Sequence, residues 1–157
     1  MPKSFVVALF GALFFSLMVF STAASAIHLG QTKTVDGVAI YLGMVPAAVM
    51  RQNPDIYPAH EPSKIPSSKH VHHVMLALFD DPGGERITDA IVTARVAPLA
   101  LAGPTKTLDP TVVAGALTYC NFFRISPSDT TVIQVEIRRP DVLRMIQARF
   151  VIEPHAE

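Results

Sequence analysis

The chain has 157 residues, and its 13 lysines and arginines balance its 13 aspartates and glutamates, so the formal net charge at neutral pH is +0. This balance, without a basic stripe, argues against nucleic-acid binding and against electrostatic attachment to membranes. Thirteen prolines and no tryptophan favour an all-β protein of short strands, and a single cysteine excludes an intramolecular disulfide.

The N-terminus has the three parts of an export signal. Lys3 supplies a positive charge, an apolar run follows from Phe5 to Phe20, and the stretch STAASA has the small-x-small pattern that signal peptidase accepts. The run is short for a transmembrane helix, which needs roughly 20 apolar residues; an uncleaved signal anchor is the alternative. We predict that residues 1–26 are removed as a signal peptide. Residues 27–157 are then expected to form one domain in the periplasm or outside the cell, without membrane insertion.

The first half of this domain predicts a strand or hairpin, a short helix and a long irregular segment. Residues 35–43 alternate weakly between apolar and polar types, and an Asp-Gly pair within them is a turn signal. Pro46 suits the first turn of a short helix, which Pro54 would end. Residues 45–69, which contain this helix and a stretch rich in proline, serine and lysine, are expected to form a strap over the surface.

The second half predicts regular strands separated by turn signals. Residues 70–79 are apolar on both faces after the first few positions, which is typical of a central strand. A DDPGGE turn leads to strict alternation over 90–96, and residues 98–110 are expected to form a loop. The remaining strands are expected over 111–123, as one strand or two, over 131–139 and over 145–152.

This pattern predicts an all-β fold, namely an immunoglobulin-like β-sandwich of about seven strands with one short helix. A helical fold is excluded because no window of three turns keeps a 3.6-residue apolar stripe free of proline. The residues expected to be buried between the two sheets are Leu76, Leu78, Val92, Val96, Ile133 and Val135.

A strand, the segment FDDPGGERI and the alternating run DAIVTARV together resemble bacterial extracytoplasmic immunoglobulin-like domains. They are similar to the periplasmic YtkA-like and FixH-like group, and the resemblance covers this motif only. It implies a hairpin within a sandwich and a non-enzymatic protein. Several members of the group are linked to copper or to the assembly of respiratory oxidases, which the resemblance extends to this chain as an expectation.

One strand of the second half opens with three histidines in four residues. Because side chains alternate along a strand, His70 and His72 share one face, and their Cβ atoms lie roughly 7 Å apart. At this distance the two imidazoles can coordinate the same ion. Neutral imidazole suits copper, zinc and nickel, and the thioether of methionine suits Cu(I). We therefore predict a copper-type metal site of His70 and His72, completed by His60, Met44 and Met50.

Three further residues rank lower as ligands. His73 and Met75 lie on the opposite face of the same strand, where packing in the core is the alternative role. Cys120, in the apolar stretch LTYCNFF, is expected to be a small buried hydrophobe, with metal ligation and an intermolecular disulfide as alternatives. The histidine pair, too, has an alternative interpretation as the polar entry of an ordinary strand.

The sequence carries no enzyme motif of the types Gly-x-Ser-x-Gly, His-Glu-x-x-His or a phosphate-binding glycine loop. We therefore expect a non-enzymatic periplasmic accessory protein that binds a metal, with copper as its cofactor and a periplasmic protein as its partner. The alternative is a metal-free β-sandwich that serves as an interaction module of an envelope complex.

Overall fold

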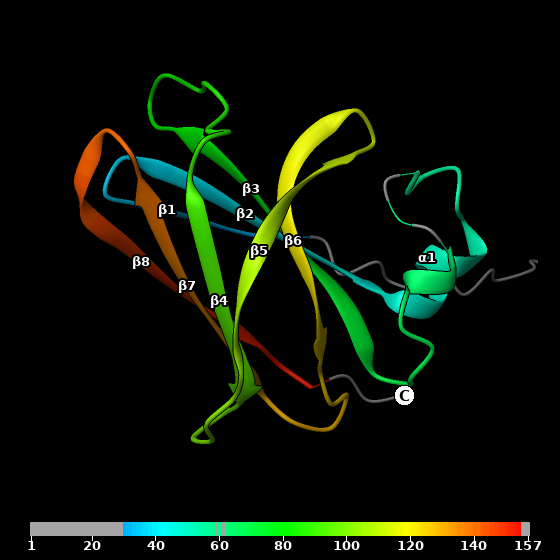
Figure 1. Cartoon of the computed structure of the whole chain (residues 1–157). Helices are drawn as coiled ribbons and strands as arrows, with labels where there is room; N and C mark the ends of the chain where they lie inside the picture. Colours follow the sequence, from blue (N-terminus) through cyan, green and yellow to red (C-terminus); the bar gives the residue numbers. More distant parts are fainter. Residues whose placement is uncertain (1–29, 59, 61, 155–157) are drawn as a thin grey trace, which may run out of the picture.

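The computed structural model describes residues 30–58, 60 and 62–154, and β-strands dominate this part of the chain (Figure 1). The strands are β1 (Gln31–Val35), β2 (Val38–Pro46), β3 (Val71–Asp80), β4 (Ile91–Pro98), β5 (Thr105–Val113), β6 (Ala116–Arg124), β7 (Thr131–Arg139) and β8 (Val142–Ile152). Helix α1 (Ala47–Gln52) and a 3₁₀ helix, η1 (Pro62–Lys64), lie between β2 and β3. The predicted signal peptide lies outside the described residues, within which no helix is long and apolar enough to span a membrane.

The strands are antiparallel neighbours in the order β1-β2-β3-β6-β5-β4-β7-β8. Strand β5 takes part in two sheets, because Thr105–Leu108 pairs with β4 and Asp109–Val113 pairs with β6. We call β1-β2-β3-β6-β5 sheet A and β5-β4-β7-β8 sheet B. The two strands at the ends of this order, β1 and β8, approach each other on the side opposite β5. There the Gln31 side chain donates to the Val151 carbonyl at 2.7 Å. The sandwich is therefore nearly closed into a barrel.

The inward faces of the two sheets share one hydrophobic core. Tyr119 and Phe150 are its largest fully buried side chains. The six core residues predicted from alternation are all buried: Leu76, Leu78, Val92, Val96, Ile133 and Val135. The all-β prediction is confirmed, with eight strands in the described part of the chain instead of about seven.

The segment FDDPGGERI does not close a hairpin, so that prediction is wrong. Strand β3 pairs with β2 and β6, whereas β4 pairs with β5 and β7. The segment therefore carries the chain from sheet A to sheet B, and an isolated bridge joins Phe79 to Arg86 on the way. Turn residues specify a change of direction, whereas burial of each strand's apolar face decides which strand becomes its partner.

The loop predicted over residues 98–110 is shorter than expected: residues 99–104 form it, whereas β5 begins at Thr105 and continues through Pro110. Proline has no N–H group to give to a strand ladder, so it is expected at edges and irregularities. Pro110 meets this condition because it lies just after Leu108, where β5 leaves its pairing with β4 and joins β6.

Two hairpins close with two-residue turns in which both residues have positive φ. The turn between β1 and β2 contains Asp36 (φ 48°) and Gly37 (φ 77°), and the turn between β5 and β6 contains Ala114 (φ 49°) and Gly115 (φ 78°). Such turns favour Asp-Gly and Asn-Gly pairs. The Asp-Gly pair therefore predicts the first turn from the sequence, whereas the Ala-Gly pair of the second turn is not a typical turn signal.

We expect Ala114→Asn to raise the free energy of unfolding by about 0.5–1 kcal/mol, because asparagine tolerates left-handed backbone better than alanine does. Urea unfolding of the variant and the wild type measures the difference. Asp36→Ala is the matched control in the other turn and should lower the free energy of unfolding. A destabilised Ala114→Asn variant would contradict this account of the turn.

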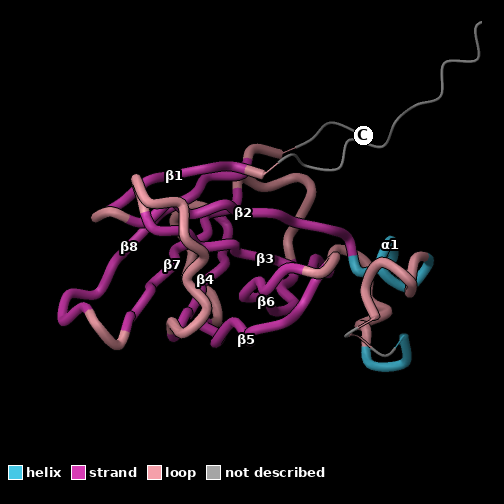
Figure 2. Tube along the Cα trace, turned by 90° about the horizontal axis from the view of Figure 1, so that it is seen from above, coloured by secondary structure: helices cyan, strands magenta, loops and turns pink. Residues whose placement is uncertain are grey.

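The described residues of the strap (45–58, 60 and 62–69) pack on the outer face of sheet A and project beyond the β2–β3 end of the sandwich (Figure 2). Helix α1 follows Pro46 and ends at Gln52, before Pro54, as predicted. The Arg51 guanidinium donates to the Pro66 carbonyl and ties the two ends of the strap together. The buried residues of the strap form a second hydrophobic cluster, which we call the strap cluster: Val45, Ala47, Met50, Tyr57 and Ile65.

Candidate metal centre

Three side chains that can ligate a metal meet between sheet A and the strap. His73 comes from β3, Cys120 from β6, and His60 from the strap, and their candidate ligand atoms all lie within 4.8 Å of one another. His73 is 0% exposed and Cys120 is 3% exposed, while His60 is half-buried. We call these residues the His60–His73–Cys120 group.

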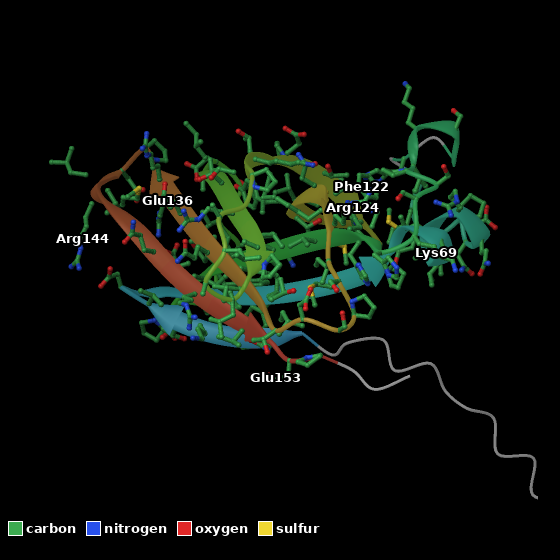
Figure 3. The ribbon with its side chains drawn as sticks, turned by 90° about the horizontal axis from the view of Figure 1, so that it is seen from below. Lys69, Phe122, Arg124, Glu136, Arg144 and Glu153 are labelled. Atoms are coloured by element: carbon green, nitrogen blue, oxygen red, sulfur yellow. The ribbon has the colours of Figure 1, made fainter. Side chains whose placement is uncertain are left out.

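The strand register brings His73 and Cys120 to the same face. His73 lies opposite Phe122, and Met75 lies opposite Cys120, in the antiparallel pair of β3 and β6. Directly opposed residues of such a pair project to the same side of the sheet. These four side chains therefore share the outer face of sheet A, while Val74 points into the core. In Figure 3, Phe122 lies toward the end of the molecule that carries Lys69 of the strap.

Backbone turns in the strap deliver His60 to this face. The Tyr57 N–H donates to the Pro54 carbonyl at 3.1 Å, and the His60 N–H donates to the Tyr57 carbonyl at 3.0 Å. The His60 ring then meets the His73 ring edge to face, with centroids 4.7 Å apart and planes at 80°. Phe122 contacts both imidazoles, at centroid distances of 5.8 and 4.8 Å. Ring packing thus holds the two histidines against each other.

Three of the four ring nitrogens of these histidines lack a partner among the described residues. Both ring nitrogens of His73 and Nδ1 of His60 are buried and accept or donate no hydrogen bond within the described part of the chain. A neutral imidazole has one donor and one acceptor, and each buried group left unpaired costs about 1–3 kcal/mol. Such groups are rare in native proteins and are commonly explained by water or an ion. A bound metal ion would satisfy the imidazole lone pairs.

Burial also sets the protonation states of the group. Desolvation, with a smaller contribution from His60, lowers the pKa of His73 to about 4, and desolvation lowers the pKa of His60 as well. Burial raises the pKa of the Cys120 thiol, although a hydrogen bond with Thr111 opposes this and Asp109 adds to it. At neutral pH both imidazoles are therefore neutral, and the thiol keeps a proton that a metal ion would displace.

The dimensions of the group suit one transition-metal ion. Ligand atoms that share an ion at bond lengths of about 2.0–2.3 Å lie about 3.3–3.9 Å from one another. Because the three candidate atoms lie within 4.8 Å of one another, small side-chain rotations would close them around an ion. Two imidazoles and a thiolate are ligands of zinc and copper.

The group contains only part of the ligand set predicted from the sequence. His60 was expected as a principal ligand, and His73 and Cys120 were expected at lower rank. His70 is exposed and lies just before β3 with a φ of 62°. His72 points to the inner side of sheet A, and its Nδ1 lies 3.3 Å from the His70 carbonyl oxygen. Neither His70 nor His72 belongs to the group.

The predicted methionine ligands have separate surroundings. Met44 lines a cavity of about 220 Å³ at the open end of the sandwich, together with His72. Met50 is fully buried in the strap cluster. Met75 shares the outer face of sheet A with Cys120. Its methyl carbon lies beside Gly43, at 3.5 Å from where a Cβ atom added to that glycine would be. Of the three methionines, Met75 is therefore the one that strand register places beside the group.

The fold and this site define the protein as a nearly closed β-sandwich with a candidate metal centre on the outer face of one sheet. No protein-family model matches the chain, and no curated protein matches it. The structure is similar to the crystal structure of a DUF4426 family protein from Pseudomonas aeruginosa PAO1, with a TM-score of 0.56 and 16% sequence identity. The match covers 82% of this chain and 98% of that chain. At this identity the similarity shows the fold alone.

Proposed function

We propose that this protein is an exported, non-enzymatic accessory protein that binds a transition metal of the copper type through His60, His73 and Cys120. The observation that carries the proposal is a buried imidazole, His73, with both ring nitrogens unpaired among the described residues, next to the half-buried His60 with its Nδ1 unpaired and to the buried Cys120 thiol. This arrangement destabilises the metal-free protein and is compensated when an ion binds, which is the expected energetics of a binding site.

The chemistry of the group favours copper or zinc over hard cations. Calcium and magnesium take oxygen ligands, and the group has none to offer. Imidazole nitrogen and thiolate sulfur select borderline and soft ions such as zinc and copper.

The proposed location and fold type rest on the sequence. The export signal in residues 1–26 supports a periplasmic or secreted protein. The resemblance of residues 69–96 to extracytoplasmic immunoglobulin-like domains supports an immunoglobulin-like sandwich that works outside the cytoplasm. A periplasmic protein that exchanges metal with this chain is the partner that such a function implies.

Metal content of the purified protein tests the proposal. After incubation with Cu(I), Cu(II) or Zn(II) and removal of free metal, the wild type is expected to retain an equimolar amount of ion. Cys120→Ser and His60→Ala should each lower the affinity at least about 10-fold, because even residues that only support metal ligands contribute that much. Circular dichroism checks that each variant keeps its fold.

The His70→Ala/His72→Ala double variant is the matched control, because it removes two histidines outside the group and should retain the metal. Metal loss in this control, with retention in Cys120→Ser, would place the site at the start of β3 instead. A wild-type protein that retains none of the three ions would contradict the proposal and favour the metal-free interaction module.

A further inference from the structure

The described side chains around the metal centre also bear on which ion it selects, an inference that rests on the proposed metal-binding function. We propose that the His60–His73–Cys120 group is built to hold Cu(I) in preference to Zn(II) and Cu(II). Cu(I) is favoured by the net charge of the complex, by its apolar surroundings and by the number of ligands.

The net charge of the metal complex favours Cu(I). An ion that binds displaces the Cys120 thiol proton to solvent, so the thiolate contributes one negative charge and the two neutral imidazoles contribute none. With Cu(I) the complex is electrically neutral, and no electron transfer is needed to form it. Zn(II) or Cu(II) would leave a net positive charge, which the protein interior solvates poorly.

The surroundings provide little to offset such a charge. The hydrophobic residues beside the group are the strap cluster, whose polar atom is the Tyr57 hydroxyl, and the partly buried residues packed against it: Val71, Met75, Val113 and Phe122. Thr111, whose side chain hydrogen-bonds with the Cys120 thiol, is an uncharged polar neighbour. Asp109 lies opposite Cys120 in β5, but it is exposed and its carboxylate is not part of the group. Its charge adds only the smallest contribution to the raised pKa of the Cys120 thiol, because water and salt screen an exposed carboxylate. The neutral Cu(I) complex is therefore the one that these surroundings favour.

The number and type of ligands point the same way. Structural Zn(II) sites almost always have four protein ligands in a tetrahedron, and this group supplies three. The additional donor that strand register places on the same face is the thioether of Met75, opposite Cys120. Thiolate and thioether sulfur favour Cu(I) over Zn(II).

Competition titrations of the wild-type protein test this selectivity. Cu(I), kept reduced under anaerobic conditions, and Zn(II) are each presented with a colour-forming chelator of known affinity. We expect Cu(I) to bind at least about 1,000-fold more tightly than Zn(II), since burial of a net charge is costly. Cys120→Ser should lower the Cu(I) affinity at least about 100-fold, because the complex then keeps an unneutralised charge.

Asp109→Asn is the matched control, because it removes the exposed carboxylate opposite Cys120 without touching the group. It should change the Cu(I) affinity less than about 3-fold, as exposed charges contribute little. Zn(II) bound as tightly as Cu(I), and lost in Asp109→Asn, would overturn the selectivity while leaving the metal site itself in place. Failure to bind either ion would overturn both this inference and the proposed function.

Discussion

The metal-free protein is expected to lose up to about 3 kcal/mol of its free energy of unfolding through His73 as the pH falls from about 7 to about 4. The folded protein lowers the pKa of His73 from 6.5 to about 4, chiefly by burial and then by the neighbouring His60. Between these values the unfolded chain binds more protons than the folded chain. Stability is therefore fully present above the unfolded pKa and is lost as the pH falls toward the folded one. The lowered pKa of His60 acts in the same direction.

His73→Leu isolates this contribution, because leucine fills the site without a titrating group or unpaired nitrogens. We expect the variant to raise the free energy of unfolding of the metal-free protein by about 1–3 kcal/mol at pH 7 and to flatten its fall toward pH 4. It should also lose the metal. Urea unfolding at a series of pH values measures both effects on stability.

His70→Asn is the control for this series, because it replaces an exposed histidine with a residue that tolerates the same left-handed backbone. Its stability should fall with pH as steeply as that of the wild type. If His73→Leu kept the wild-type slope, His73 would not be the group that destabilises the protein in acid.

Phe150→Ala is expected to lower the free energy of unfolding by about 3–5 kcal/mol, because a large aromatic side chain is removed from the core. Phe150 is 0% exposed, and its truncation would leave a cavity between the two sheets. Urea unfolding of the variant and the wild type measures the loss. Leu143→Ala is the matched control on the same strand, since Leu143 is fully exposed and its removal should change stability by less than about 0.5 kcal/mol. Similar losses at both positions would contradict the assignment of faces along β8.

Local patterns in the sequence predicted local structure well. Strict alternation predicted the buried face of β7, and Pro46 predicted the start of α1. The patterns failed where a distant partner decided the outcome. The turn before β4 joins two sheets instead of closing a hairpin, and Pro110 lies inside β5 because that strand changes partners nearby. These outcomes depend on which apolar faces are buried together, and a short window of residues does not contain that information.

The candidate site was likewise predictable from the sequence only in part. Alternation along β3 determined that His72 and His73 point to opposite faces, and the residue types determined that imidazole, thiol and thioether ligands were available for a soft metal. Only the tertiary structure decided which of these ligands meet. The register of β3 against β6 places His73 near Cys120, and the strap adds His60 and covers the face. Ligands that lie far apart in the chain converge through long-range pairing and burial, whereas sequence spacing reports only neighbours on one strand.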